Sequence, residues 1–473
     1  MVTGMPVRFE WNGRQVEVDD QTAHPHVTLL AWLRERGTTG SKEGCAEGEC
    51  GACAVAFVER DARGRGRFTP VNSCLVPLAA VHGRKLVSVE GIAAASGELH
   101  PVQRVMVEQG GSQCGYCTPG FVVSMFCEYY RPGRMEFDVE ALSGNLCRCT
   151  GYRPIASAAS GLGPPPVTDP QLKVLARPPG PLGSSLSRGQ SASFVRPQNL
   201  TELFAAWSKR STATLLAGGT DLMVYVNQRD QRYEDLIALD AIEALSEISH
   251  DDGALHIGAA ATLSALSDSL HATPELSLLA QLLPLFASRL IRNRATLGGN
   301  LATASPIGDA APVLLALGAE LTLVSVKGER RLPLHEFFTG YRKHVLGPQE
   351  LILTVHVPSR QPALQRFYKV SKRVIDDIST VAAAFTLQLA PDLTVQRMTA
   401  AYGGIAATPV RAFALEQAVQ GHPWNAQTRD LGIAALSGLA TPIGDHRGSA
   451  AYRSALVPRL FQKFFAETER PGT

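Results

Sequence analysis

The chain has 473 residues, of which 45% are hydrophobic and 19% charged, and its formal net charge is +2. This length predicts several domains, because one domain usually has ~100 to 200 residues. The nearly neutral, mixed composition excludes a polycationic nucleic-acid binder, an acidic tail and a disordered chain. No apolar run reaches membrane-spanning length and the N-terminus does not resemble a leader, so we expect a cytoplasmic protein without nucleic-acid or membrane partners.

The N-terminal residues predict a small α+β unit. Residues 7–18 alternate in hydrophobicity on both sides of Asn12-Gly13, the dipeptide that best supports a two-residue hairpin turn. Residues 28–37 (TLLAWLRERG) carry apolar residues at helical spacing. Strand-like segments follow at 54–58 and 85–90. We therefore expect the first domain to span residues 1–90.

The rest of the chain predicts a helical domain, a linker and two further domains. Helical patterns dominate residues 91–162, and residues 163–193 are rich in Pro, Gly and Ser, which is typical of an interdomain linker. Strands and helices then alternate around glycine turns, which indicates a mixed α/β domain over residues 194–358. Two strand-like runs followed by helices predict a fourth domain over residues 359–473.

All nine cysteines lie between Cys45 and Cys149, a distribution unlike that of a secreted disulfide scaffold. In a reducing compartment, clustered cysteines favour metal or redox chemistry. Four of them follow the C-x4-C-x2-C spacing of plant-type ferredoxins with a fourth thiol downstream, which predicts a [2Fe-2S] cluster on Cys45, Cys50, Cys53 and Cys74. Gly44, Gly48 and Gly51 would let backbone amides approach that cluster. A structural zinc site and disulfides are the alternatives.

A second set combines C-x2-C with C-x-C and consists of Cys114, Cys117, Cys147 and Cys149. Four thiolates suit either another iron-sulfur cluster or a tetrahedral zinc ion, and the spacing alone leaves both open. The remaining cysteine, Cys127, lies in the apolar run FVVSMFC, so we expect a buried and inert core thiol.

The chain resembles the molybdenum hydroxylase (xanthine oxidase) family, and within it the small iron-sulfur/FAD subunit of bacterial xanthine dehydrogenases. The motifs that carry the resemblance are GCAEGECGACAV, QCGYCTPG, GNLCRCTGYRPI, LAGGTDL, TLGGNLATASPIGD and FFTGYRK. It implies a multidomain α+β fold: a β-grasp ferredoxin-like domain, a helical [2Fe-2S] domain, a vanillyl-alcohol-oxidase-like FAD domain and a C-terminal α+β domain. It also implies iron and sulfur, not zinc, on the second cysteine set.

The resemblance further implies an FAD site built from two segments and three single residues. The diphosphate-binding turn would comprise Leu216, Ala217, Gly218, Gly219, Thr220, Asp221 and Leu222. The second segment would contribute Thr296, Gly299, Asn300, Thr303, Ser305, Ile307 near the flavin ring, and Asp309. The single residues would be Phe286, Ile352 and Lys369. Without the resemblance, Gly218-Gly219 predicts only a tight turn, and Phe286 a core position.

An NAD site would lie beside the flavin. The resemblance places Tyr341, Asp376, Asp377 and Ile378 there, whereas the residues alone predict a solvated charged turn in KVSKRVIDDIS. No nucleophile-base motif such as G-x-S-x-G is present in the sequence. We therefore expect no catalytic side chain and a reaction carried by cofactors.

By resemblance, the chain is an enzyme subunit that transfers electrons during oxidation of hypoxanthine and xanthine to urate. Molybdenum would sit on a separate molybdopterin-binding large subunit in an (αβ)2 heterotetramer. Electrons would pass through two [2Fe-2S] clusters to FAD and then to NAD. The alternatives are the same subunit type serving another substrate, such as an aldehyde, nicotinate or carbon monoxide, or a zinc-stabilised scaffold without redox function.

Overall fold

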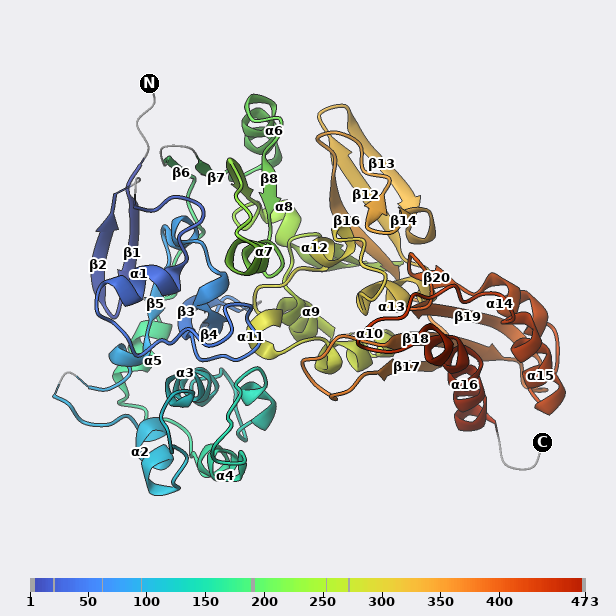
Figure 1. The fold of residues 1–473 in the computed structure, drawn as a ribbon, viewed down its shortest axis with the longest axis horizontal. Helices are drawn as coiled ribbons and strands as arrows, with labels where there is room; N and C mark the ends of the chain where they lie inside the picture. The colour runs from blue at the N-terminus through green and yellow to red at the C-terminus, as the bar shows by residue number, and fades with distance from the viewer. Residues whose placement is uncertain are drawn as a thin grey trace. The chain divides into compact units, whose positions relative to one another are not determined.

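The structure is a computed structural model that describes residues 5–19, 22–61, 63–94, 96–188, 192–251, 253–270 and 273–469 (Figure 1). The chain divides into two compact units. Unit 1 comprises residues 1–243 together with 288–295, and unit 2 comprises residues 244–287 together with 296–473. The range predicted for the FAD domain therefore contributes to both units.

The N-terminal sheet of unit 1 begins with the predicted hairpin of β1 (Val7–Trp11) and β2 (Arg14–Val18). Asn12 and Gly13 have φ values of 49° and 76°, as the tight turn requires. The strand order is β2-β1-β5-β3-β4, with β1 and β5 parallel. Helix α1 (Leu29–Glu35) packs its apolar face on this sheet, and the Thr28 hydroxyl accepts a hydrogen bond from the backbone N–H of Ala31 at its start.

Unit 1 continues with a helical region and a second sheet of order β6-β7-β9-β8. Its further elements are β3 (Ala54–Arg60), β4 (Gly66–Asn72), β5 (Lys85–Val87), α2 (Pro101–Glu108), α3 (Thr118–Tyr129), α4 (Arg153–Ser160), α5 (Pro170–Leu175), β6 (Ser185–Arg188), β7 (Ser193–Arg196), α6 (Leu200–Lys209), β8 (Thr214–Leu216), α7 (Leu222–Arg229), β9 (Asp235–Ala238) and α11 (Arg289–Arg292).

Helix α3 is the centre of the helical region and packs against β3 and β4. Its side chains from Phe121 to Tyr129 are buried, and Phe126 meets Phe68 of β4 with ring centroids 4.7 Å apart. Cys127 is buried in this core, as predicted.

The stretch predicted as a linker is partly ordered into secondary structure. Its Pro170 occupies the first turn of α5, where the Asp169 carboxylate accepts from the backbone N–H of Gln171. Leu175 is buried, and Arg60 Nε donates to the Pro179 carbonyl over 2.8 Å. Composition did not reveal this, because Pro and Gly are as common at caps and strand ends as in connectors.

Unit 2 contains the sheets β10-β11-β16-β12-β13, β14-β15 and β17-β18-β19-β20. Helix α8 (Glu243–Ser246) crosses the boundary between the units. The elements of unit 2 are β10 (Ile248–His250), β11 (Ala254–Gly258), α9 (Leu263–Ser269), α10 (Ser277–Leu282), α12 (Leu297–Ala302), α13 (Ala310–Ala316), β12 (Glu320–Ser325), β13 (Gly328–Pro333), β14 (Phe338–Gly340), β15 (Lys343–His344), β16 (Leu351–Pro358), β17 (Leu364–Val370), β18 (Val381–Leu389), β19 (Val395–Gly403), β20 (Val410–Arg411), α14 (Phe413–Val419), α15 (Ala426–Ala435) and α16 (Ala450–Thr468).

The sheet around β18 is covered on both faces. Alternate residues, including Phe385, join the apolar core formed with α14, α15 and α16. On the other face, Thr386 and Thr399 share a hydrogen bond, and the Thr399 hydroxyl donates to the Ala316 carbonyl at the end of α13. Because both faces are buried, β18 reads as a continuous apolar run and not as an alternating one.

Candidate cofactor sites

The first cysteine set, here called the plant-type site, lies on the loop between α1 and β3 and on the turn after β4. Gly48 and Gly51 have φ values of 87° and 67°. A Cβ atom on Gly51 would lie 2.4 Å from the Gly144 carbonyl oxygen, and one on Gly44 would lie 2.8 Å from Cys50 Sγ. Glycine is thus needed both for the left-handed backbone and for space beside the sulfur atoms.

The four sulfur atoms of the plant-type site form two pairs. Cys53 and Cys74 Sγ lie 3.4 Å apart, and Cys45 lies within hydrogen-bonding reach of Cys50. Donation from the Cys50 thiol lowers the pKa of Cys45 to about 5, and the Cys74 thiol likewise lowers the pKa of Cys53. Two thiol pairs fit a [2Fe-2S] cluster, in which two protein thiolates bind each iron.

The second set, here called the helical-domain site, lies on the loops before α3 and α4 and also forms two pairs. Cys114 pairs with Cys149, and Cys117 with Cys147. Burial raises the pKa of Cys117 to about 12, whereas Cys114 and Cys149 are exposed. The Thr150 backbone N–H donates to the Cys147 sulfur over 3.4 Å. In the part of the chain that the structure describes, no three His, Cys, Asp or Glu side chains surround a single-ion position.

The two cysteine sites are connected within unit 1. The backbone N–H of Leu146, next to Cys147, donates to the carbonyl of Cys50 over 3.0 Å. The Tyr116 hydroxyl, between Cys114 and Cys117, donates to the Glu43 carbonyl. Close packing also requires glycine here, because a Cβ atom on Gly120 would lie 2.2 Å from the Gly51 carbonyl oxygen. The loops that carry the two sets of ligands are therefore neighbours.

The predicted diphosphate-binding turn lies in unit 1, between β8 and α7. Gly219 has φ 80°, and a Cβ atom on Gly218 would lie 1.9 Å from the backbone oxygen of Arg294. Leu216, Gly218 and Gly219 are buried, whereas Thr220 is half-buried and Asp221 exposed. Glycine is therefore required at position 218 by close packing against backbone and at position 219 by the left-handed conformation.

The second predicted FAD segment lies in unit 2. Thr296 caps α12, its hydroxyl accepting from the Gly299 backbone N–H over 3.1 Å. Five residues of this segment that would contact the ligand are half-buried and lie outside the hydrophobic core: Gly299, Asn300, Thr303, Ser305 and Ile307. Ile352 lies on β16 and is only 4% exposed. This burial favours a role in packing beneath the segment over direct contact with FAD.

Asp309 and Lys369, which come from separate motifs, meet in unit 2. Lys369 Nζ lies 2.9 Å from an Asp309 carboxylate oxygen and 2.7 Å from the carbonyl of Leu285, the neighbour of Phe286. Burial raises the pKa of Asp309, although Lys369 and the Ser379 hydroxyl oppose that shift. Phe286 itself is half-buried, so its side chain is not the core residue that the local sequence predicts.

The predicted NAD residues lie on two exposed features of unit 2. Tyr341 follows β14 and is 56% exposed, and Ile378 is 42% exposed. The Asp377 carboxylate accepts from the backbone N–H groups of Arg373 and Ile378 over 2.8 and 2.9 Å. Partial burial would raise the pKa of Asp377, but these hydrogen bonds hold it below its ordinary value. Asp377 therefore shapes its loop as a charged carboxylate.

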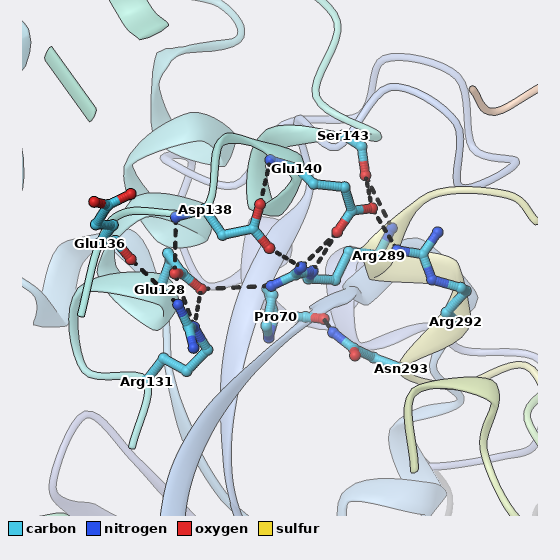
Figure 2. A network of polar contacts seen from close by, with 10 residues as sticks. All are labelled: Pro70, Glu128, Arg131, Glu136, Asp138, Glu140, Ser143, Arg289, Arg292 and Asn293. Carbon is cyan, nitrogen blue, oxygen red and sulfur yellow. Dashed lines mark hydrogen bonds and ion pairs between the residues drawn. The ribbon is translucent and has the colours of Figure 1, made fainter. Parts of the chain in front are cut away.

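A network of charged residues joins the segment 288–295 to the helical region of unit 1 (Figure 2). Arg289 pairs with Glu128, Asp138 and Glu140 at N···O distances of 3.4, 2.5 and 2.5 Å. Its backbone N–H also donates to the Ser143 hydroxyl. Glu128 is buried, and burial raises its pKa.

Replacing Arg289 with methionine should lower the free energy of unfolding by about 1.5 to 3 kcal/mol at pH 7, since charged hydrogen bonds are lost. The loss should be smaller near pH 5. Without Arg289, the pKa of Glu128 rises further above its ordinary value of 4.5. The stability of the variant therefore falls as the pH rises from the ordinary pKa of this carboxyl group through its raised pKa. Urea unfolding at both pH values measures this. An equal loss at both would contradict it, and Arg104→Met, which breaks an exposed pair with Glu98, is the control.

Sequence reasoning missed three amide side chains around the plant-type site. Asn72 Nδ2 donates to the Gly48 carbonyl over 2.8 Å. Asn227 and Gln228, on α7, donate to carbonyls of the cysteine segments. Asn72 could have been noticed from its place two residues before Cys74, but no local pattern connects α7 to a loop that is more than 150 residues earlier.

Four family models match the chain in order. They are described as 2Fe-2S iron-sulfur cluster binding domain (residues 9–79), [2Fe-2S] binding domain (88–160), FAD binding domain in molybdopterin dehydrogenase (190–360) and CO dehydrogenase flavoprotein C-terminal domain (366–468). This chain belongs to the molybdenum hydroxylase family. It is the iron-sulfur and FAD portion of such an enzyme, with two [2Fe-2S] domains and one FAD domain in a multidomain α+β fold, as predicted.

Named relatives agree with this assignment. Xanthine dehydrogenase of Drosophila pseudoobscura pseudoobscura is 33% identical over 98% of this chain, and xanthine dehydrogenase/oxidase of Gallus gallus is 30% identical over 98%. The chain spans 39% and 40% of the length of these relatives.

Solved structures of the family are also similar. Carbon monoxide dehydrogenase from Hydrogenophaga pseudoflava matches with a TM-score of 0.54 and 27% identity over 57% of this chain and 94% of that one. Quinoline 2-oxidoreductase from Pseudomonas putida 86 matches with a TM-score of 0.53 and 25% identity over the same shares. Among the described residues, no helix combines the length and apolar character needed to cross a membrane.

Proposed function

We propose that this chain is the electron-transfer subunit of an NAD-dependent xanthine dehydrogenase. In this proposal, hypoxanthine and xanthine are oxidised to urate at a molybdenum site on a molybdopterin-binding partner subunit. The electrons then pass through the helical-domain site and the plant-type site to FAD and to NAD. The observation that carries the electron path is the hydrogen bond from Leu146 to the Cys50 carbonyl, which links the two ligand loops directly. The purine and NAD parts of the proposal are supported by the similarity to xanthine dehydrogenases.

The side chains of this chain would hold and separate the cofactors. The two thiol pairs of each cysteine site supply eight thiolates in all for two clusters. Bound clusters would accept and release single electrons, and FAD would exchange them in pairs. In this proposal, backbone N–H groups of the turn at Gly218 and Gly219 would bind the FAD diphosphate. Asp309 and Lys369 form a buried charged pair at the second FAD segment.

Electron entry is best placed at the helical-domain site. Cys114 and Cys149 are exposed, and apolar side chains beside the ligands are exposed as well, with Tyr116 at 47%, Leu146 at 43% and Tyr152 at 44%. Exposed apolar side chains around a cofactor site favour an interaction with a partner protein. This surface would receive the molybdenum subunit, in an (αβ)2 heterotetramer.

A different substrate is the main alternative. Carbon monoxide dehydrogenase and quinoline 2-oxidoreductase are among the similar solved structures, so the same electron-transfer chain could serve another molybdenum site. A xanthine dehydrogenase and a xanthine dehydrogenase/oxidase each match 98% of this chain, and these two relatives favour the purine proposal.

An anaerobic titration of the purified chain with NADH tests the NAD step. We expect flavin and iron-sulfur absorption to bleach together. Asp377→Asn should slow the reduction by about tenfold, or about 1.4 kcal/mol, because the amide has one oxygen to accept the two hydrogen bonds that shape the loop. Asp392→Asn, which alters another exposed turn carboxylate, is the matched control. If the bands respond only to dithionite, the NAD assignment of Tyr341, Asp376, Asp377 and Ile378 fails, while the cofactor sites stand.

A further inference from the structure

Helix α7 contacts the plant-type site directly. The Asn227 side-chain amide donates to two backbone carbonyls, those of Ala46 (2.9 Å) and Cys74 (2.8 Å). The neighbouring Gln228 donates to the Cys45 carbonyl over 2.6 Å. All these residues belong to unit 1. The helix that follows the predicted FAD turn therefore binds the backbone of two ligand segments.

These carbonyls need donors because of the way the loop is folded. Its backbone N–H groups turn toward the cysteine sulfurs, and those of Glu47, Cys50 and Glu49 hydrogen-bond to Cys45. Carbonyls of the same loop accept hydrogen bonds from groups outside it: the Cys50 carbonyl from the Leu146 N–H, and the Gly48 carbonyl from the Asn72 amide. A buried or half-buried carbonyl without a donor costs free energy, and the amides of α7 remove that cost.

The Ala46 contact reaches a cysteine sulfur through one peptide group. Asn227 Nδ2 donates to the Ala46 carbonyl, and the N–H of the same peptide unit belongs to Glu47, which donates to the sulfur of Cys45. Hydrogen bonds in series polarise one another, so donation to the carbonyl strengthens the N–H donor. Stronger hydrogen bonds to cluster sulfur favour the electron-rich, reduced state and raise the reduction potential.

The Cys74 contact adds a geometric role. Cys45 and Cys74 belong to different thiol pairs of the plant-type site, so they would bind different irons. One amide group of Asn227 joins both segments. Its two hydrogens are fixed in one plane, and they hold the two ligand segments at a set separation.

We propose that Asn227 is a positioning residue for the plant-type cluster, which holds the Cys45 and Cys74 segments together and raises the reduction potential of the cluster through the Ala46 peptide. The inference goes beyond the proposed function, because it depends on neither the purine nor NAD. It rests only on Cys45, Cys50, Cys53 and Cys74 being the ligands.

A redox titration of the full-length chain, followed by EPR, tests the role of Asn227. In Asn227→Leu, we expect the plant-type cluster to be harder to reduce, with an equilibrium constant about tenfold lower, which equals about 59 mV for a one-electron couple. The potential of the helical-domain cluster should stay unchanged. Cys50→Ala identifies the plant-type signal, because that signal should be the one it loses.

The matched control is Asn293→Leu. It removes an amide-to-carbonyl hydrogen bond of 2.8 Å, from Asn293 Nδ2 to Pro70 in β4, that does not reach a ligand segment. Its potentials should equal those of the wild type. Asn227→Gln keeps a carboxamide and should recover part of the shift.

The outcomes separate this inference from the ligand assignment. Two signals with unchanged potentials in Asn227→Leu would overturn the inference and leave the assignment intact. If the wild-type chain shows no signal that Cys50→Ala removes, the ligand assignment fails instead. If Asn227→Leu loses its cluster, the smaller Asn227→Ala decides: a more negative potential supports the inference, and an unchanged one overturns it.

Discussion

Replacing Asp240 with asparagine is expected to lower the free energy of unfolding by about 3 to 5 kcal/mol at pH 7, because it leaves buried arginines without their counter-charge. The Asp240 carboxylate lies 2.7 Å from Arg84 Nη2 and 2.9 Å from Arg196 Nε. The Arg196 side chain is fully buried, and that of Arg84 is 9% exposed. Burial and the positive charge of Arg84 lower the pKa of a third arginine, Arg294, to about 10.

The stabilisation by the Asp240 carboxylate should weaken at low pH. Burial would raise the pKa of Asp240, but Arg196 and Arg84 hold it well below its ordinary value of 3.8. The stabilising charge is therefore fully present above about pH 4 and is lost as the pH falls through the lowered pKa. The difference in stability between wild type and Asp240→Asn should hence narrow below that pH.

Urea unfolding of the full chain at pH 7 and pH 3 measures both effects. Glu17→Gln is the matched control, since its pair with Arg8 is 59% and 63% exposed and should contribute at most about 1 kcal/mol. A loss for Asp240→Asn no larger than that of the control would show that Asp240 does not balance the buried arginines.

Local features were predicted well because their cause lies in adjacent residues. The Asn12-Gly13 turn needs positive φ values at both positions, and the structure has them. The spacing of Cys45 and Cys50 likewise reflects the reach of a short loop, and the structure brings these two side chains within hydrogen-bonding reach. In both cases, the sequence pattern records a constraint on nearby backbone.

Contacts between distant segments could not be predicted in this way. Asp240 meets Arg84 across 156 residues, and Asn227 reaches Cys74 across 153. The segment 288–295 lies inside the predicted FAD domain but folds with the helical region through Arg289. The three arginines in RLIRNRA were the only local sign that this segment pairs with acidic residues elsewhere. A run of charged residues, however, more often forms a solvent-exposed face. Partners of such side chains depend on chain topology, which periodicity does not determine.

Replacing Cys149 with alanine is expected to remove one of the two iron-sulfur EPR signals and to reduce bound iron from about four to about two atoms per chain. Cys149 supplies one thiol of the pair with Cys114 in the helical-domain site. Its side chain is exposed, so the substitution removes a ligand without opening a cavity in the core. The plant-type site should be unaffected, because its four sulfurs come from other loops.

The buried thiol of Cys127 provides the matched control for that experiment. It lies in α3 at 4% exposure, and neither cysteine pair of the helical-domain site includes it. Cys127→Ala should keep both signals and the full iron content, at the stability cost of a small core cavity. Iron analysis with EPR after dithionite reduction distinguishes the outcomes. Retention of both signals in Cys149→Ala would refute the ligand set, and zinc in place of iron would favour the non-redox scaffold.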